Sequence, residues 1–231
     1  MASLFTLDMG GSLLALLFGV TIFYLSPNMW WFFIAVLIDF LVLSSLVTRA
    51  KEESKAVLKG YEKTRSWRNV VANGLVPVVV VVVYFLFKNV WGVSLIHGQI
   101  IVFAFVASVA SISADKFASE LGVLGQQMPI DIITRKRVKR GTSGGVTWFG
   151  TLMGLVASFL IGLSVFALGA SVAVFVVVIF AGMFGNFVDS LLGHFEEKKI
   201  GNKYTSNLVC SVAGAVFCAA VLYLLPITLL V

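Results

Sequence analysis

The stretch VVANGLVPVVVVVVYFLF at residues 70–87 holds no charged side chain. A run of this length can cross the hydrocarbon core of a bilayer as a helix, which takes about 20 apolar residues. The stretch also lacks the apolar–polar alternation of a membrane β-strand. It therefore predicts a transmembrane helix.

Further apolar runs accompany this one along the chain. They lie at 11–25, 30–48, 96–114, 145–168, 170–190 and 206–229. Of the 231 residues, 59% are hydrophobic and 12% are charged, whereas a soluble domain has about 25% charged residues. We expect an all-α polytopic transmembrane helix bundle of about seven spans. With their loops these spans use up residues 1–231, so we expect a single transmembrane domain.

The basic residues indicate how the bundle sits in the membrane. They gather in the alternate loops 49–68, 115–144 and 191–204, and only Lys88 falls in a loop on the opposite side. By the positive-inside rule these three loops and the N-terminus are cytoplasmic, and the C-terminus is outside. The formal charge of +6 is thus a topology signal. No aromatic and basic cluster of the RNA-binding kind occurs, so we expect no nucleic-acid partner.

Polar side chains recur at helical spacing near the cytoplasmic ends of the runs. The fourth run carries Ser108, Ser111 and Asp115 on one face, with Glu120 at the start of the following loop. The sixth run does the same with Gly182, Gly185, Asn186, Asp189 and Gly193, and milder stripes are Arg65, Asn69 and Asn73 in the third run and Asn207 and Ser211 in the seventh. Ionisable residues in spans are costly and indicate function by default, whereas small residues at this spacing also serve close helix packing.

One further acid, Asp39, lies halfway along the second run without a charged neighbour in sequence. It either bonds a polar group of another helix or belongs to a functional path, and the sequence leaves both readings open.

A basic and glycine-rich stretch, RKRVKRGTSGG at 135–145, precedes the fifth run. Glycines let backbone N–H groups approach an anion, hydroxyl groups add donors, and a helix N-terminus favours negative charge. With Lys139 and Arg140 beside it, the loop predicts a phosphate-binding site. The alternative is a flexible turn whose cations touch anionic lipid headgroups, which accounts for residues 135–137.

Carboxylates on the same face complete a recognisable pair with this loop. Mg²⁺ is typically held by one or two carboxylates plus substrate phosphates, and Asp115, Glu120 and Asp189 are the candidate ligands. Phosphoryl transfer consists mostly of positioning and charge neutralisation, so this equipment suffices. Neither histidine contributes, because His97 lies on the far side and His194 is a lone loop residue.

Three segments resemble the signature segments of the phytyl-phosphate-kinase-like integral membrane family, which is distantly related to dolichol and phytol kinases. They are SADKFASELG (113–122), RGTSGGV (140–146) and GMFGNFVDSLLG (182–193), while RNVVANG (68–74) and GNKYTSN (201–207) are similar to two weaker ones. The resemblance covers nearly the whole chain in the expected order. It implies a kinase that uses CTP or another nucleoside triphosphate to convert an isoprenoid monophosphate, of phytyl or geranylgeranyl type, to the diphosphate.

The resemblance and the residue chemistry together assign roles. The catalytic candidates are Asp115, Glu120, Asp189, Lys139 and Arg140, and the first three are the Mg²⁺ ligands. The nucleotide- and phosphate-binding candidates are Gly141, Thr142, Ser143, Gly144, Gly145, Lys116, Asn186, Asn207, Arg68 and Asn73. Lys116 departs from the threonine that is common in plant-like members, and it could neutralise a phosphate or mark a different substrate.

The expected setting is a prokaryotic cell membrane with the active face cytoplasmic, because no plastid-type transit peptide is present. The expected partners are the nucleotide, the isoprenoid monophosphate lipid and membrane lipids, and a homodimer is left open. Two alternatives remain. One is a nucleotidyltransferase that forms a CDP-activated lipid with the same residues, and the other is a lipid or anion transporter that uses Asp39.

Overall fold

The structure is a computed structural model that describes residues 7–56, 64–92 and 95–230. Part of the predicted basic loop at 49–68, including Lys59 and Lys63, lies outside the described residues. The helices are α1 (Met9–Leu25), α2 (Trp30–Arg49), α3 (Glu52–Ala56), α4 (Trp67–Asn89), α5 (Leu95–Gly122), α6 (Trp148–Gly162), the 3₁₀ helix η1 (Leu163–Leu168), α7 (Val172–Glu197) and α8 (Lys203–Leu224). Two short antiparallel strands, β1 (Ile130–Asp131) and β2 (Gly145–Val146), pair with each other.

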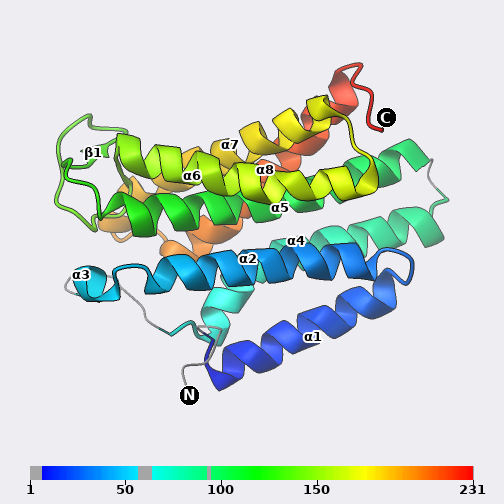
Figure 1. Cartoon of the computed structure of the whole chain (residues 1–231), viewed down its shortest axis with the longest axis horizontal. Helices are drawn as coiled ribbons and strands as arrows, with labels where there is room; N and C mark the ends of the chain where they lie inside the picture. The colour runs from blue at the N-terminus through cyan, green and yellow to red at the C-terminus, as the bar shows by residue number, and fades with distance from the viewer. Residues whose placement is uncertain (1–6, 57–63, 93–94, 231) are drawn as a thin grey trace.

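The prediction of a helical membrane bundle is confirmed. Within the described ranges six helical segments are long and apolar enough to cross a membrane, namely α2, α4, α5, α6 with η1, α7 and α8. The first helix, α1, has 17 residues, so it is about 25 Å long and shorter than a hydrocarbon core of about 30 Å. Figure 1 shows α1 inclined to the other helices.

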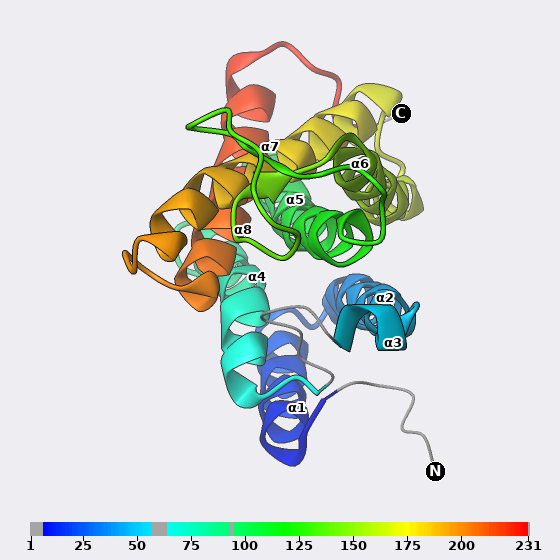
Figure 2. The same ribbon diagram turned by 90° about the vertical axis from the view of Figure 1, so that its left-hand side faces the viewer.

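The bundle is organised around α5. Seen from one end, α5 lies in the middle of the bundle with α2, α4, α6, α7 and α8 around it, and α1 lies at the outside beside α4 (Figure 2). Some 72% of the apolar window of α5 is buried, against 39% or less in the other spans. The aromatic rings of Phe103 and Phe105 are among its fully buried side chains.

Close backbone contact holds α5, α7 and α8 together at one level. The hydroxyl of Ser111 donates to the Ala107 carbonyl at 2.8 Å and to the Ala181 carbonyl of α7 at 3.3 Å. A Cβ atom at Gly185 would lie 2.7 Å from the Cys210 carbonyl and would overlap the Ser111 side chain. A Cβ atom at Gly214 would overlap the same side chain. The small-residue positions therefore serve close packing, as one reading of the sequence allows.

Several helices differ in length from the apolar runs. The run 96–114 continues as helix to Gly122, and the run 170–190 continues to Glu197, so Glu120 and His194 lie in helices and not in loops. A prediction from apolar runs ends at the first charged residue, whereas the helix continues wherever charged side chains have partners. In contrast, the fifth helix begins only at Trp148, with Thr147 as its N-cap.

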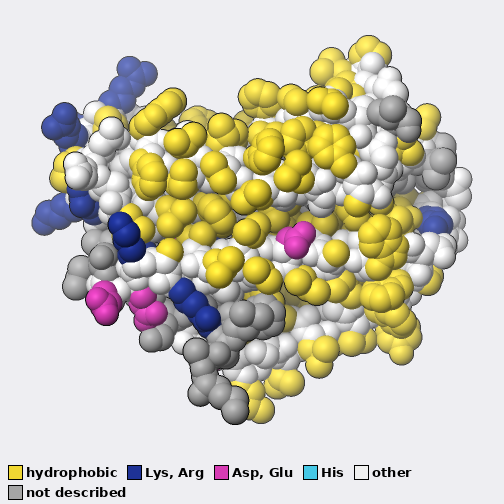
Figure 3. Space-filling view, in the orientation of Figure 1, with side chains coloured by type: hydrophobic (Ala, Val, Ile, Leu, Met, Phe, Trp, Pro, Cys, Tyr) yellow, Lys and Arg dark blue, Asp and Glu magenta, His cyan; other side chains and the backbone are white. Residues whose placement is uncertain are grey.

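The charged residues gather at one end of the bundle, and a broad apolar surface covers the helices (Figure 3). Asp39 interrupts this surface, because it lies on the exposed side of α2. It does not face the bundle interior, where membrane acids are usually found. The compartments that the two ends face remain a prediction from the positive-inside rule.

The contact of Ser111 with Gly214 yields a test of the packing. The substitution Gly214→Ala should lower the stability of the bundle by about 1–3 kcal/mol, since an added methyl group overlaps Ser111. The double variant Gly214→Ala with Ser111→Ala should recover part of that loss. Thermal unfolding in detergent measures both. The matched control is Gly19→Ala, where a Cβ atom would meet nothing within 4 Å, and equal effects at positions 19 and 214 would contradict the packing argument.

Candidate functional site

A cavity of about 360 Å³ opens at the charged end of the bundle. It brings together most of the residues that the sequence assigns to a site. They are Asn73, Asp115, Lys116, Glu120, Gly141, Thr142, Ser143, Gly144, Gly145, Asn186, Asp189 and Asn207. Two of these residues also join helices directly, because Asn207 on α8 donates to the side-chain oxygen of Asn73 on α4 at 2.8 Å.

Glu120 binds a cluster of cations on one side of the cavity. Its carboxylate pairs with Lys55 at 3.1 Å and makes closer contacts with Arg65 and Lys116. The side chains of these residues are between 2% and 15% exposed, so solvent screens the cluster weakly. The sequence predicts Glu120 as a metal ligand, but this carboxylate is already engaged by three cations. We define Lys55, Arg65 and Lys116 as the cation cluster.

Lys55 is the most deeply placed member of the cation cluster. Its ammonium group donates to the carbonyls of Val47 at 2.6 Å and Thr48 at 2.8 Å, at the C-terminal end of α2, where a cation is favoured. Burial and nearby Arg65 lower the pKa of Lys55 and Glu52 raises it, so that the pKa falls from 10.5 to about 8. The lysine is therefore still largely protonated at neutral pH.

Two carboxyl groups lie close together in the same cavity. Asp115 of α5 and Asp189 of α7 interact directly. Neither forms an ion pair with a basic residue in the part of the chain that the structure describes, and Asp189 Oδ1 is buried there without a hydrogen-bond partner. Paired acids without a counter-ion either share a proton or hold a cation. We refer to them as the acid pair.

The glycine-rich loop lines the cavity, but its donors are engaged by acids of α7. The Ser143 hydroxyl donates to Glu196 at 2.7 Å, and the Ser143 backbone N–H donates to Glu197 at 3.1 Å. Carboxylates therefore occupy the Ser143 N–H and hydroxyl groups, which the sequence assigns to a phosphate. Their position is thus compatible with hydrogen bonds to an anion.

The glycines of this loop also have a packing role. Gly144 has a φ of 76°, and a Cβ atom on it would lie 2.6 Å from the His194 backbone nitrogen. Gly193 meets Gly144 from the other side. Since Gly145 belongs to β2 and Thr147 caps α6 by accepting from the Gly150 N–H at 2.9 Å, the loop does not itself begin the helix. The predicted contribution of a helix N-terminus to phosphate binding is thus reduced.

A buried pair attaches the segment before the glycine-rich loop to α7. His194 Nδ1 lies 2.7 Å from Asp131 Oδ2, and Asp131 also accepts hydrogen bonds from Thr134. The description of His194 as a lone loop residue is therefore wrong, since it is a buried residue of α7. Burial raises the pKa of Asp131, but the hydrogen bonds from Thr134 and His194 outweigh it and lower the pKa to about 2.

Three predicted site residues do not line the cavity. Arg68 is exposed with its guanidinium over the Trp67 ring, Lys139 is exposed, and Arg140 donates outside the cavity to the Gln126 carbonyl at 2.6 Å. The cavity instead takes in residues that the sequence reasoning did not assign to the site, namely Lys55, Arg65, Glu196, Glu197 and Lys203. Only Arg65 gave a signal, because it lies four residues before Asn69, and their side chains are hydrogen bonded at 3.4 Å.

Comparisons with known proteins place the chain among membrane proteins. The family described as integral membrane protein DUF92 matches residues 2–216. An uncharacterized membrane protein of Methanocaldococcus jannaschii is 35% identical over 185 residues, which are 80% of this chain and 74% of that protein. Protein PGR of Arabidopsis thaliana is 31% identical over 180 residues, 69% of this chain, and the match covers only 62% of that longer protein. No solved structure matches the chain.

The Asp131–His194 pair should determine how firmly the segment around β1 is attached to α7. Asp131→Asn should weaken the attachment by about 1–3 kcal/mol and so speed trypsin cleavage at the exposed residues Arg135–Arg137 roughly tenfold. Because the pKa is lowered from 3.8 to about 2, the contribution of Asp131 is complete above about pH 4 and is lost as the pH falls toward 2. The control is Glu53→Gln, an exposed acid of α3. Equal cleavage rates in wild type and Asp131→Asn would contradict the proposed attachment.

Proposed function

The chain belongs to the DUF92 family of integral membrane proteins, and we propose that it transfers a phosphoryl group from a nucleoside triphosphate to an isoprenoid monophosphate. CTP is the expected donor and the isoprenoid diphosphate is the product. The observation that carries the proposal is one cavity at the charged end of the bundle that is lined by both the acid pair and the cation cluster. The positive-inside rule makes the cytoplasm the expected side of the reaction.

The presence of cations in the same cavity as the acid pair supports a phosphate-bearing substrate. Lys116 lies next to Asp115 in sequence but pairs with Glu120, so the acid pair keeps its negative charge or a shared proton. A phosphate group in the cavity would meet Arg65 and Lys116, which both line it. Cations that neutralise charge on a transferred group are the main requirement of phosphoryl transfer.

The acid pair fits a Mg²⁺ ion. Two carboxyl groups, one with a buried oxygen that lacks a hydrogen-bond partner among the described residues, match an ion that takes one or two carboxylates and completes its shell with water and phosphate. Asp115 and Asp189 would hold the ion, and Glu120 would not. Bound there, Mg²⁺ would supply charge neutralisation to the phosphates of the nucleotide.

The transfer itself needs little from the protein beyond position and charge. An oxygen of the acceptor monophosphate bonds to the γ-phosphorus, the bond from this phosphorus to the β,γ-bridging oxygen breaks, and the nucleoside diphosphate leaves. The acceptor is already an anion, so no side chain has to remove a proton. Lys116 and Arg65 take the charge-stabilising role that the sequence suggests for Lys139 and Arg140.

The transport alternative loses its main support, because Asp39 lies on the exposed side of α2 and not in the cavity. Nucleotidyl transfer would use the same cavity. An experiment with labelled CTP distinguishes it from phosphoryl transfer by which phosphate of CTP reaches the lipid. We propose phosphoryl transfer because it is the reaction that the resemblance of the sequence segments implies, whereas the cation cluster would bind phosphate groups in either reaction.

The activity test uses purified protein, Mg²⁺, geranylgeranyl monophosphate and CTP labelled in either the γ- or the α-phosphate. The γ-label should appear in the lipid diphosphate. Asp115→Asn and Asp189→Asn should each reduce turnover by at least about a hundredfold, because each removes a carboxylate that would hold the ion. The matched control is Asp39→Asn, an acid on a span outside the cavity, which should keep wild-type turnover.

Two results would contradict the proposal. Transfer of the α-label to lipid would show nucleotidyl transfer instead. No labelled lipid with any tested prenyl phosphate and nucleotide, from protein with wild-type thermal stability, would exclude both reactions.

A further inference from the structure

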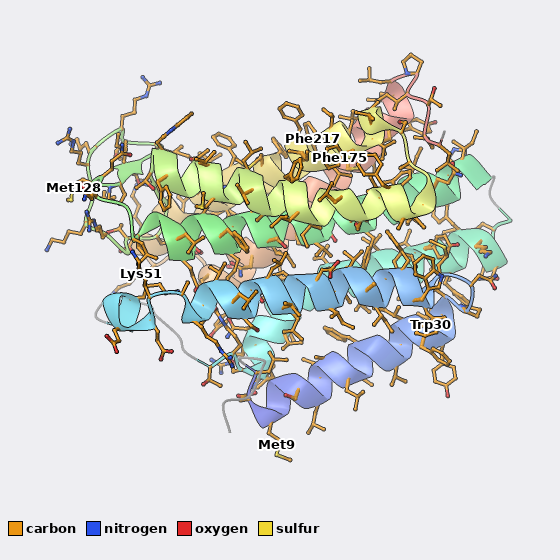
Figure 4. The ribbon with its side chains drawn as sticks, in the orientation of Figure 1. Met9, Trp30, Lys51, Met128, Phe175 and Phe217 are labelled. Atoms are coloured by element: carbon orange, nitrogen blue, oxygen red, sulfur yellow. The ribbon has the colours of Figure 1, made fainter. Side chains whose placement is uncertain are left out.

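The basic run at 135–140 takes no part in lining the cavity. Its five cations, Arg135, Lys136, Arg137, Lys139 and Arg140, are all exposed, and none of them lines the cavity. We call the segment from Met128 to Arg140 the basic hairpin. Figure 3 shows basic side chains at this end of the molecule, and Figure 4 places Met128 at the same end as Lys51 and at the opposite end from Trp30.

The basic hairpin is a structured element. The Asp131 N–H donates to the Lys136 carbonyl at 2.9 Å, the Val138 N–H donates to the Pro129 carbonyl at 2.9 Å, and the Arg135 N–H donates to the Asp131 carbonyl at 2.8 Å. These bonds fold the basic run back on the preceding residues and hold its side chains outward.

Charge is sorted between the two sides of this hairpin. Its one acid, Asp131, is turned inward and pairs with His194. The cations point outward, and within the described residues none of the five makes an ion pair with an acid. Exposed apolar side chains lie among them, with Met128 48%, Ile130 47% and Ile133 44% exposed. A surface that combines cations and apolar side chains in this way suits the boundary between lipid headgroups and hydrocarbon.

The position of the hairpin supports the same partner. It connects the end of α5 at Gly122 with the start of α6 at Trp148, and both helices are candidate spans. Trp148 is 75% exposed, and exposed tryptophans at helix ends mark the membrane interface. The hairpin therefore belongs to the end of the bundle at which α5 and α6 meet the predicted interface, where attraction to headgroups acts over about 10 Å.

We propose that the basic hairpin docks on the phosphate groups of anionic lipids in the membrane that holds the protein, with Met128, Ile130 and Ile133 entering the interface. Each cation near an anionic surface adds to the attraction, so several cations suffice for a local preference over zwitterionic lipid. This inference does not depend on the proposed transfer reaction.

A thiol-reactive fluorophore at Ile133→Cys tests the docking. The native cysteines, Cys210 and Cys218, are buried in the bundle, so the label goes to position 133. In nanodiscs that contain phosphatidylglycerol, the label should become protected from an aqueous quencher, and added salt should reverse the protection. In pure phosphatidylcholine it should stay accessible. The variant Lys136→Gln with Arg137→Gln should need roughly tenfold more phosphatidylglycerol for the same protection.

The control variant is Lys198→Gln with Lys199→Gln, which removes two exposed cations from the loop after α7 and should leave the label protected. Equal accessibility in both kinds of nanodisc would overturn the proposal. An equal loss in both double variants would also overturn it, because the effect would then come from net charge and not from the hairpin. Protection by CTP or inorganic phosphate in pure phosphatidylcholine would assign the hairpin to a soluble anion instead.

Discussion

The position of the candidate site depends on the contact of the Ser111 side chain with Gly185 and Gly214. The helices α5 and α7 run in the same direction (Figure 1). The residue one turn after Ser111 and the residue one turn after Gly185 therefore lie at the same level. These next positions are Asp115 and Asp189. The two acids meet because the glycine four residues earlier lets the helix backbones approach, and a larger residue there would separate them. Packing in the apolar part of the bundle thus determines the electrostatics at its end.

Glu120 brings the cations together, as the glycine contacts bring the two acids together. Three cations near one carboxylate would repel one another without it, and removal of one partner from a buried ion pair is strongly destabilising, by about 3–5 kcal/mol. Lys116 is a neighbour of Asp115 but lies one turn from Glu120 on the same helix, so the pair at i and i+4 forms instead. Lys116 therefore forms no ion pair with Asp115. The opposed charges of the cavity therefore follow from the order Asp115, Lys116 and Glu120 along one helix.

Much of the bundle and the site could be predicted because their signals are local in sequence. The apolar runs, the one-sided charge and the turn-by-turn spacing of Asp115 with Ser111 each lie within a few residues. Lys55 could not be found in this way, since a buried lysine that binds the end of α2 reads like any cation of a cytoplasmic loop. The Asp131–His194 pair joins residues 63 positions apart, and no local sequence pattern predicts it.

The glycine-rich loop shows how one pattern can satisfy two requirements. Its composition predicts anion binding, yet Gly144 also has a backbone that must pass Gly193 of α7 at a distance no side chain allows. The same contact brings Ser143 to Glu196 and Glu197, so carboxylates are bound where a phosphate is expected. A phosphate that enters must displace these acids or share the donors with them. Negative charge on Glu196 and Glu197 therefore opposes the binding of a phosphate at the loop. A divalent cation at the acid pair would reduce that repulsion. If the proposed function holds, phosphate binding at the loop would therefore depend on the metal, and the metal would couple the loop to the acid pair.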